Sequence, residues 1–523
     1  MEEVMIEEGF EALKEKLRDP LWRLTSGKLY SIAPADGTGV QPFRPRPEQV
    51  RIFEEVHLNG KRRILIPKAR RLGMSTALGI MMLDWCLWKS RQTCELIDRN
   101  EKEATKKLGG IVGTALDHLP EWLKSQMKTL RRNDSAIEFD VADKGKRTMQ
   151  GGVNARGGSN DFLWISEWGV IQSEDAKRSA AIRSGALPSA RHGLTVIETT
   201  WAGGKGGDVW ELLEPTLKGE ADDWLVLFFP WWIDPRNVHP NASMDEASRK
   251  YFERIGPRLQ ADGIQLSDQQ KRWWAKERRE QGIFMQRENP TFLDECWSAP
   301  IKGAILAEEL SRAMAEGRIA QMPVDGSSLV HTSWDLGSPQ NTVCWYWQVV
   351  GRMIRVIDCD VGGEETMTER VGRMLAKGYS YGRHYLPHDV MQTERSGETL
   401  ASVLTRAGLR NLVTVPPIHS VWVGINALSE LFPSLEFRSP QCDRGVDGLA
   451  AWRTRETPDG RSEEPVHDWA SHVGDALRTL GEAYRAGMVQ FSWGPGQGKA
   501  NQEPREPWER SRRRGMKAQM VGG

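Results

Sequence analysis

The chain has 523 residues, 39% of them hydrophobic and 27% charged, a balance that excludes a largely disordered protein. At about 150 residues per domain, this length predicts roughly two to four folded units. The 71 basic and 71 acidic residues cancel. Net charge therefore gives no argument for a nucleic-acid partner, and only local patches could provide one.

The cysteines and the N-terminal segment indicate the cellular compartment. The six cysteines form no CxxC pair and no His–Cys cluster, which argues against a zinc site or a disulfide framework and fits a reducing compartment. The N-terminal segment MEEVMIEEGFEALKEKL is acidic and amphipathic, unlike the start of a secretory leader. Because no apolar run approaches the roughly 20 residues needed to cross a bilayer, we expect a soluble intracellular protein with no membrane partner.

The pattern of apolar residues divides the chain into segments. From Lys61 to about Pro230, short apolar runs alternate with helical stretches, which is typical of a parallel α/β sheet. After Ser328 three β runs lie close together, and Gly351-Arg352 joins the last two, TVCWYWQVV and MIRVIDCD, as a hairpin. A long helix is expected from Asp468 to about Ala486. The expected segments are a helical and turn-rich start (1–40), a phosphate-binding domain (41–235), a helical linker or lid (236–324), a second domain (325–490) and a basic, disordered tail (491–523).

The segment RRILIPKARRLGMST places an apolar strand before a loop and an apolar helix, where backbone N–H groups and a helix N-terminus can face a phosphate. It departs from the usual GxxxxGK[ST] pattern, with Lys68 in place of the first Gly and Met74 in place of the Lys. Lys68 can still reach back over the loop to supply a cation, and Ser75 can ligate Mg²⁺. The alternative is an ordinary strand–turn–helix with a basic loop.

Other segments of this half add groups for nucleotide chemistry. DFLWISEWG ends an apolar strand at Ser166-Glu167, where Glu167 can polarise an attacking water, and ARGGSN puts Arg156 on a Gly-rich turn within reach of a γ-phosphate. TVIETTWAGG ends another strand at Glu198 and leads into a Gly-rich loop suited to sensing phosphate loss. Gln49 offers an amide to read adenine. The residues expected to contact the nucleotide are Gln49, Lys68, Arg71, Gly73, Met74, Ser75, Thr76 and Thr200.

The second half carries three acids at the ends of predicted elements. Asp335 ends a β run in SWDLG, just before a glycine, and Asp389 ends the short run HYLPHDV. HDWASHVGDALRTL places Asp468, His472 and Asp475 on one face of a helix. Acids from two strand ends and a helix can hold two Mg²⁺ ions about 3.5–4 Å apart for phosphodiester cleavage. Each acid alone would more commonly be a solvated residue or a helix cap.

The order Gln49, Lys68, Arg156, Glu167, Glu198 resembles that of the large terminase subunit of tailed bacteriophages. KARRLGMST is similar to that family's variant Walker A, ARGGSNDFLWISEWG to its Arg-finger and Walker-B segment, and IETTWAGG to its coupling motif. LPHD and SHVGDALR are similar to the second and third acidic motifs of its nuclease. Two departures stand out: Ser166 lies where some members have Asp, and Gln340 lies where many have a further acid.

The resemblance implies an α/β fold, with an N-terminal P-loop (RecA/ASCE-like) parallel-sheet ATPase followed by a C-terminal ribonuclease H-like mixed-sheet nuclease. It implies that ATP and Mg²⁺ drive the translocation of double-stranded DNA into a procapsid, and that Mg²⁺ or Mn²⁺ supports the cutting of concatemeric DNA. The catalytic residues it implies are Glu167 and Arg156 for ATP hydrolysis and the metal-ligating Asp335, Asp389 and Asp475 for cleavage. Asp358 and Asp360 would either contact the metal ligands rather than the metal itself or be exposed acids of the hairpin. His388 and His472 would carry protons.

The partners implied by the resemblance are a portal protein, a small terminase subunit that selects DNA, and further copies of the chain in a ring, with a monomer in free solution and the host-cell cytoplasm as the location. Two other readings of the residues stay open. One is an ATP-dependent helicase-nuclease or transposition-type enzyme. The other, motivated by Met74 and Ser166, is a scaffold that binds ATP without turning it over.

Overall fold

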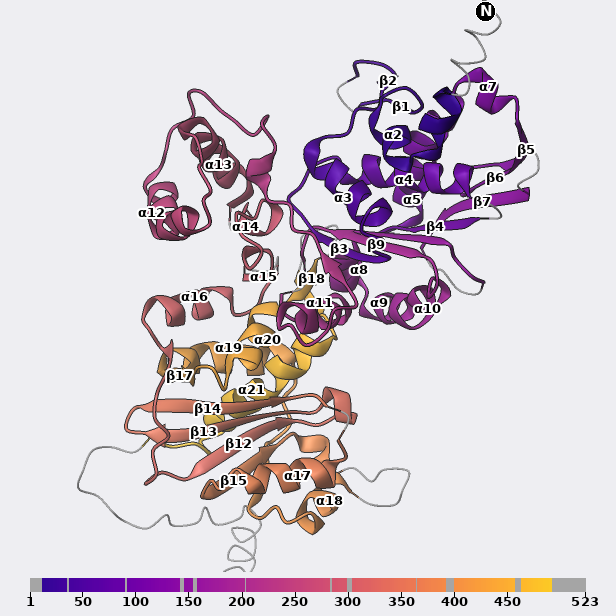
Figure 1. Cartoon of the computed structure of the whole chain (residues 1–523). Coiled ribbons are helices and arrows are strands. Elements are labelled where there is room, and N and C mark those ends of the chain that lie inside the picture. Colours follow the sequence, from indigo (N-terminus) through magenta and orange to yellow (C-terminus); the bar gives the residue numbers. More distant parts are fainter. Residues whose placement is uncertain are drawn as a thin grey trace, which may run out of the picture.

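The computed structural model describes residues 12–34, 37–89, 92–141, 145–153, 158–202, 204–282, 285–298, 303–363, 365–391, 399–456 and 462–491. Two large sheets, each covered by helices on both faces, are joined by a helical region (Figure 1). This arrangement confirms the expected mixed α/β class, with a parallel-rich sheet first and a mixed sheet second. Within the described residues, no helix combines the length and the apolarity needed to cross a membrane.

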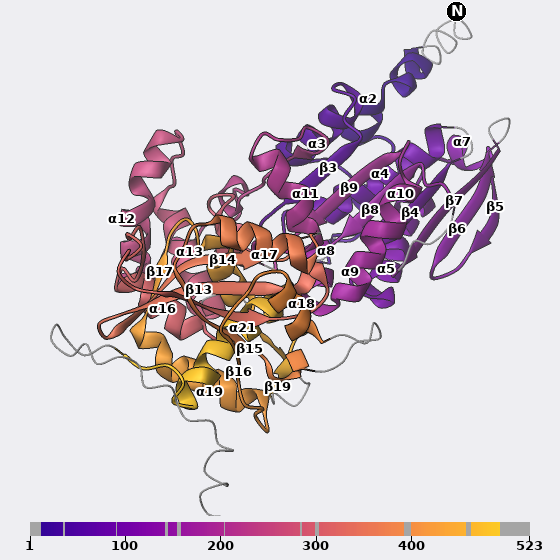
Figure 2. The same cartoon turned by 90° about the horizontal axis from the view of Figure 1, so that it is seen from below.

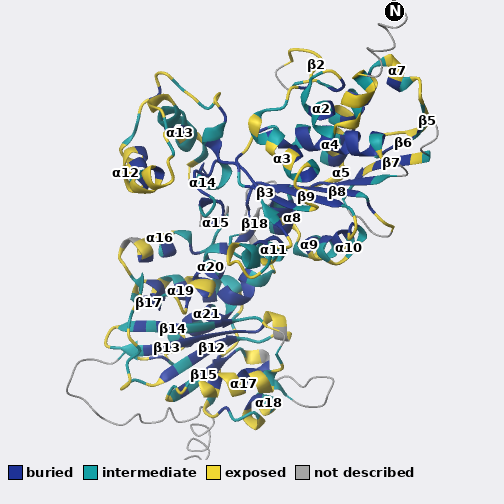
Figure 3. Cartoon of the chain, in the orientation of Figure 1, coloured by how far each residue is buried: buried dark blue, intermediate teal, exposed yellow. Residues whose placement is uncertain are grey.

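The first sheet has eight strands in the described part of the chain, and its parallel strands form one side of it. The strands β10, β3, β9, β8, β4 and β7 pair in parallel, and β7, β6 and β5 pair antiparallel. In sheet order they are β10 (Leu225–Val226), β3 (Arg63–Pro67), β9 (Leu194–Thr199), β8 (Phe162–Ser166), β4 (Thr93–Ile97), β7 (Gly145–Gly152), β6 (Ala136–Val141) and β5 (Met127–Arg132). The central parallel strands β3, β9, β8 and β4 are buried along nearly their whole length (Figure 3), as expected where helices cover both faces.

Helices pack on both faces of this sheet, with α3 to α5 on one face and α8 to α11 on the other (Figure 1). Helix α4 (Met74–Trp88) is buried along most of its length because its sequence is apolar on every side. Its one buried acid, Asp84, is neutralised by Arg23 at 2.8 Å and accepts a hydrogen bond from Tyr30 at 2.7 Å. The remaining elements here are α2 (Pro20–Thr25), β1 (Ser31–Ile32), β2 (Gln41–Pro42), α3 (Pro47–His57), α5 (Glu101–Lys107), η1 (Leu108–Gly113), α6 (Thr114–Asp117), α7 (Glu121–Lys124), α8 (Trp168–Glu174), α9 (Ala176–Ala181), η2 (Ile182–Ala186), α10 (Leu187–Ser189) and α11 (Asp208–Leu217).

The helical region between the sheets holds the charged segment expected to form a linker or lid. Its core is aromatic: the ring of Trp274 stacks on Tyr251 with centroids 4.1 Å apart, and Trp273 stacks on Trp231 at 5.2 Å. Both views place α12 and α13 on the opposite side of the molecule from β5 (Figures 1 and 2). The elements are η3 (Trp231–Ile233), α12 (Glu246–Ala261), α13 (Asp268–Gln281), α14 (Met285–Glu288), α15 (Glu295–Ser298) and α16 (Ala307–Ala315).

The second sheet is mixed, with seven strands among the described residues. Strand β12 is antiparallel to β13 and parallel to β15, so the carboxyl ends of β12 and β15 lie at the same edge. The expected hairpin is confirmed, because β13 and β14 pair antiparallel across Gly351 and Arg352. In sheet order the strands are β11 (Ile319–Ala320), β17 (Leu435–Arg438), β14 (Met353–Val361), β13 (Val343–Val350), β12 (Val330–Asp335), β15 (Tyr381–Leu386) and β16 (Leu412–Thr414).

Helix α21 (Trp469–Arg485) is fixed across the second sheet by two polar contacts. Thr479 donates to the carbonyl of Trp334 at 3.1 Å, and the indole of Trp345 donates to the carbonyl of Val473 at 3.0 Å. These bonds hold the helix beside the end of β12. The other elements of this part are η5 (Pro339–Asn341), α17 (Met367–Ala376), η6 (His388–Met391), α18 (Leu400–Arg406), α19 (Val421–Leu431), η7 (Phe432–Ser434), α20 (Asp443–Ala451), β18 (Thr454–Glu456) and β19 (Ser462–Pro465).

Two histidines make the second sheet sensitive to acid. Burial lowers the pKa of His331 and of His384 from 6.5 to about 4. The Nδ1 of His384 lies 2.7 Å from the Thr332 hydroxyl, and His331 Nδ1 accepts the N–H of Arg383 at 2.9 Å. Since the unfolded chain binds more protons between pH 6.5 and 4, the stability given by the neutral rings is present above about pH 6.5 and is lost as the pH falls toward 4.

We therefore expect the melting temperature of the second sheet to fall between pH 7 and pH 5, measured by thermal denaturation followed by circular dichroism. His384→Asn removes one titrating group and can keep the hydrogen bond at the Nδ1 position, so the fall should be smaller in this variant. An equal fall in wild type and variant would contradict the assignment to His384.

Candidate functional site

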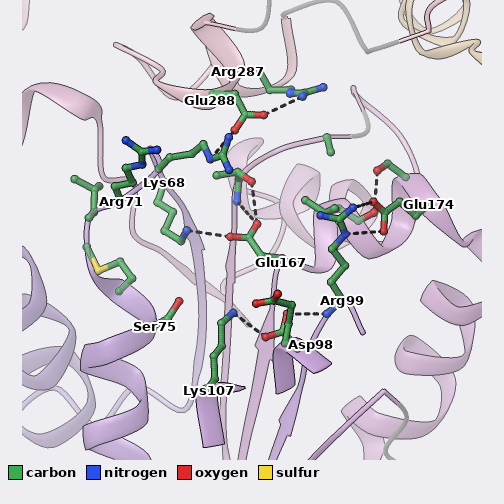
Figure 4. Close-up of a pocket in the computed structure, with 18 of the residues that line it drawn as sticks. Lys68, Arg71, Ser75, Asp98, Arg99, Lys107, Glu167, Glu174, Arg287 and Glu288 are labelled. Atoms are coloured by element: carbon green, nitrogen blue, oxygen red, sulfur yellow. Dashed lines mark hydrogen bonds and ion pairs between the residues drawn. The ribbon is translucent and has the colours of Figure 1, made fainter. Parts of the chain in front are cut away.

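A cavity of about 1070 Å³ opens at the carboxyl ends of the parallel strands of the first sheet. Its walls come from the loop after β3, the ends of β4 and β8, the residues after β9, helix α14 and the β18–β19 segment of the second half. Charged side chains from these elements point into it (Figure 4). The lining residues include Lys68, Arg70, Arg71, Gly73, Met74, Ser75, Asp98, Arg99, Lys107, Glu167, Glu174, Thr200, Arg287, Glu288, Arg453, Thr454 and Val466.

The loop between β3 and α4 takes the form expected of a phosphate loop. Gly73 has φ 70°, and a Cβ there would lie 2.7 Å from the Arg46 guanidinium, so the turn requires glycine. Helix α4 begins at Met74, and the N–H groups of its first turn, which includes Ser75 and Thr76, have no partner within the helix. The Met74 side chain is 1% exposed and packs in the core, so only its backbone is offered to an anion.

Lys68 is placed between two carboxylates. Its ammonium lies 3.2 Å from Glu167 Oε1 and 3.0 Å from Glu198 Oε2, and its side chain is 7% exposed. Burial lowers the pKa of Lys68, but the charges of Glu167 and Glu198 outweigh it and the net pKa is raised. Lys68 therefore stays charged, and the loop has a cation although position 74 carries none.

Glu167 faces the cleft from the end of β8. Its backbone is left-handed, with φ 56°, a conformation that is uncommon outside glycine and is often found at functional sites. Its Oε2 accepts hydrogen bonds from the Thr200 N–H and hydroxyl, both at 2.9 Å. Glu167 and Thr200, both predicted site residues, thus meet although they follow different strands. Their contact connects the loop after β9 to the Glu167 carboxylate.

Gln49 lies differently from the expectation that it reads adenine. Its Oε1 accepts the N–H of Arg46 at 3.0 Å and its Nε2 donates to the carbonyl of Gly73 at 2.9 Å. The amide is 4% exposed, and both of its ends hold backbone groups. In this structure Gln49 therefore holds the loop between β3 and α4 in place. Arg71 is exposed at the cleft, and Arg156 lies outside the described residues.

Several charged residues of the cleft were not predicted from the sequence. Asp98, at the end of β4, is 1% exposed and pairs with Lys107 at 2.7 Å. Arg99 pairs with Glu174 at 2.5 Å at the cleft (Figure 4). The rule that drew attention to Glu167, an acid after an apolar strand, applies equally to Asp98 in TCELID.

The second half of the chain reaches this cleft through Arg453. Its guanidinium donates to the carbonyl of Ser173, at the end of α8, at 2.6 Å and pairs with Asp468 at 2.8 Å. Asp468 in turn caps α21, accepting the N–H groups of Ala470 and Ser471. Asp468 thus serves as the N-cap residue of α21, just before the first residue of the helix that carries Asp475.

Asp335 and Asp475 lie at the edge where β12 ends. Asp335 Oδ2 is 2.8 Å from His472 Nδ1, and Asp475 accepts a hydrogen bond from Arg478 at 2.9 Å. Burial raises the pKa of Asp475, the Arg478 charge lowers it, and the Asp335 charge raises it again, with a net rise. The strand-end acid and the helix acid are thus close enough to influence each other.

Asp389 lies in η6, directly after β15, at the same edge as the end of β12. Its side chain is outside the described part of the structure. Among the side chains that are described, no group of three His, Cys, Asp or Glu residues is close enough to hold a metal ion. The exposed His388 begins the same η6 turn.

Asp358 and Asp360 occupy another part of the second half. Lys377 pairs with Asp358 at 2.6 Å, and Arg373 pairs with Asp360 at 2.9 Å. Both cations come from the α17 side of the sheet, so these acids are paired rather than exposed. Helix α21, which carries Asp475, lies on the other face of the sheet (Figure 1). Sequence reasoning missed Arg478 and Glu482, which pair on α21 at i,i+4 spacing.

The fold and the site define an α/β protein with a charged cleft at the carboxyl ends of a parallel-rich sheet, followed by a mixed sheet with acids at a strand end. No protein-family model and no curated protein matches the sequence. Large terminases are among the solved structures that it is similar to.

Three of these structures illustrate the likeness. The HK97 bacteriophage large terminase is 12% identical, with a TM-score of 0.45 over 89% of this chain and 99% of that one. The large terminase of a thermophilic bacteriophage, in complex with ATP-γ-S, is 12% identical, with a TM-score of 0.31 over 83% and 98%. The large terminase nuclease from thermophilic phage G20c with bound magnesium is 17% identical, with a TM-score of 0.26 over 35% and 98%.

Proposed function

We propose that the chain is a large terminase subunit, in which ATP hydrolysis in the cleft drives double-stranded DNA into a procapsid and the second half cuts concatemeric DNA. The observation that carries this proposal is the contact of Lys68 and Thr200 with opposite oxygens of Glu167. A loop cation that binds phosphates and an acid that orients the attacking water are groups that phosphoryl transfer to water uses, and Thr200 holds that acid in place.

In the proposed ATPase reaction, the first turn of α4 and Lys68 bind the phosphates. The negative charge of the nucleotide draws the Lys68 ammonium away from Glu167, which frees this carboxylate to orient a water and accept its proton. The hydrogen bond from Thr200 to Glu167 then transmits this change at the Glu167 carboxylate to the loop after β9. Mg²⁺ would neutralise charge on the phosphates, with Ser75 among the residues that hold it. Arg156 is proposed to stabilise the γ-phosphate.

In the proposed nuclease, Asp335, Asp389 and Asp475 hold the divalent cations. Their donor set is carboxylate oxygen, which suits Mg²⁺ or Mn²⁺ better than zinc or copper. These cations would polarise the phosphodiester and activate water. His472 orients Asp335 through their 2.8 Å contact and can exchange a proton with it. Arg478 neutralises Asp475 beside them.

The partners follow from the proposal as a whole. We propose a ring of subunits on a portal protein, a small terminase subunit that selects DNA, and action in the host-cell cytoplasm. The buried Met74 and the serine at position 166 motivate one rival, an ATP-binding scaffold without turnover. The helicase-nuclease reading remains the other alternative.

The test is the ATP turnover of the purified chain with and without linear double-stranded DNA, together with plasmid cleavage in Mg²⁺ or Mn²⁺. We expect turnover that DNA stimulates and cleavage that chelation of the metal abolishes. Nucleotide binding without turnover would support the scaffold instead. Separation of the DNA strands during turnover would support a helicase-nuclease.

A further inference from the structure

Ser166 immediately precedes Glu167, the proposed general base of the cleft. In phosphate-loop enzymes, Mg²⁺ is held by the Ser or Thr of the loop and by an aspartate on the neighbouring acid-bearing strand. Here β8 ends at Ser166, and Glu167, which follows it, is held by Lys68 and Thr200. Strand β8 therefore has no second carboxylate at its end to offer to a cation at Ser75.

Glu198 supplies a carboxylate at that position from the adjacent strand. Strand β9 lies between β3 and β8, and Glu198 pairs in register with Ile66 on one side and Ser166 on the other. Its Oε1 accepts the hydroxyl of Ser75 at 2.9 Å and the hydroxyl of Ser166 at 2.7 Å. The loop serine is thus bonded to a carboxylate that comes from β9 rather than from β8.

The burial and bonding of Glu198 point to a cation ligand. The residue is fully buried, and its Oε2 has no hydrogen-bond partner in the described part of the chain, although the Lys68 ammonium lies 3.0 Å away. Burial raises the pKa of Glu198, but Lys68 and Lys107 lower it, and the net pKa is about 2. The cation that faces Oε2 is Lys68, and in the proposed reaction a bound nucleotide draws this ammonium toward its phosphates, so the buried carboxylate then needs another cationic partner.

Asp98 is the other acid near this point, and its contacts differ. It pairs with Lys107 at 2.7 Å, and Lys107 also donates to Ser166 at 2.5 Å. Glu198 makes a direct bond to Ser75, whereas the bonds of Asp98 run to Lys107 and the N–H of Arg99.

We propose that Glu198 is the carboxylate that holds Mg²⁺ at the nucleotide site with Ser75, directly or through a bound water, in place of the acid missing at position 166. Ser166 is then a positioning residue that fixes Glu198 through its hydroxyl. This inference rests on the proposed ATPase function. It also gives Glu198 a role in cation binding, beyond the sensing role expected for its strand end.

The test measures the affinity of a fluorescent ADP analogue with excess Mg²⁺ and with EDTA, in the Asp335→Asn background so that the second half contributes less metal binding. Wild-type Glu198 should give tighter binding with Mg²⁺. Glu198→Gln should lose this Mg²⁺ enhancement, on the order of tenfold or more as for other losses at metal sites, and keep its affinity in EDTA. Glu174→Gln, at an acid of the same cleft that pairs with Arg99 instead, is the matched control, and it should keep the enhancement.

Two further variants keep the inference falsifiable if Glu198→Gln does not fold. Ser166→Ala should weaken the Mg²⁺ enhancement by a smaller factor, because it removes one of the bonds that position the carboxylate. The double variant Ser166→Asp, Glu198→Gln should restore the enhancement by returning the acid to β8. An unchanged enhancement in folded Glu198→Gln, or in Ser166→Ala if the former is unfolded, overturns the inference. Absence of nucleotide binding by the parent chain, with or without Mg²⁺, would instead overturn the proposed function itself.

Discussion

Glu167→Gln is expected to lower ATP turnover by roughly 10²–10⁴-fold, the usual loss when a general base is removed. The glutamine keeps the size of the side chain and an oxygen that can accept the bonds of Thr200, but it cannot take a proton from water. Nucleotide binding should persist, because the phosphate loop and Lys68 are unchanged. Phosphate release measures the turnover, and a fluorescent nucleotide measures the binding.

Glu174→Gln is the matched control for this variant. Glu174 lies in the same cleft, but it is 45% exposed and pairs with Arg99. An exposed ion pair contributes little to stability, so turnover should stay within about twofold of wild type. Loss of turnover in Glu174→Gln, or its retention in Glu167→Gln, would contradict the assignment of Glu167 as the base.

Asp335→Asn is expected to abolish DNA cleavage while ATP turnover stays near the wild-type level. The amide cannot neutralise a divalent cation, and it disturbs the contact with His472 that holds the strand-end group in place. Plasmid nicking and linearisation in Mn²⁺ provide the measurement. The loss should exceed that from His472→Asn, because the carboxylate is the proposed ligand and the histidine orients it.

Asp443→Asn serves as the control in the same half. Asp443 is an exposed acid in the first turn of α20, and the same chemical change there should leave cleavage intact. Equal loss of cleavage in Asp335→Asn and Asp443→Asn would show that the assay reports general damage rather than loss of a metal ligand.

Local patterns in the sequence predicted the elements and the strand ends well. The strand before the phosphate loop, the helix from Met74 and the hairpin at Gly351 each follow from apolar spacing and a turn signal a few residues long. The positions of Lys68 and Glu167 in the cleft follow in turn, since the carboxyl ends of parallel strands meet at one edge of a sheet.

Contacts between distant parts of the chain could not be predicted in this way. The bond from Ser75 to Glu198 joins residues 123 positions apart, and the bond from Arg453 to Ser173 joins residues 280 positions apart. The local sequence gives no sign that the Gln49 amide bonds to the backbone carbonyl of Gly73 rather than facing adenine. Such pairings depend on the packing of whole elements, which a motif does not record.

The central claim is that two chemically separate sites, one in each half, perform ATP hydrolysis and DNA cleavage. The most direct measurement is ATP turnover and plasmid cleavage on the same folded preparations of wild type, Glu167→Gln and Asp335→Asn. We predict that Glu167→Gln loses turnover and keeps cleavage, and that Asp335→Asn loses cleavage and keeps turnover. Loss of both activities in either folded variant would contradict the claim of two separate sites.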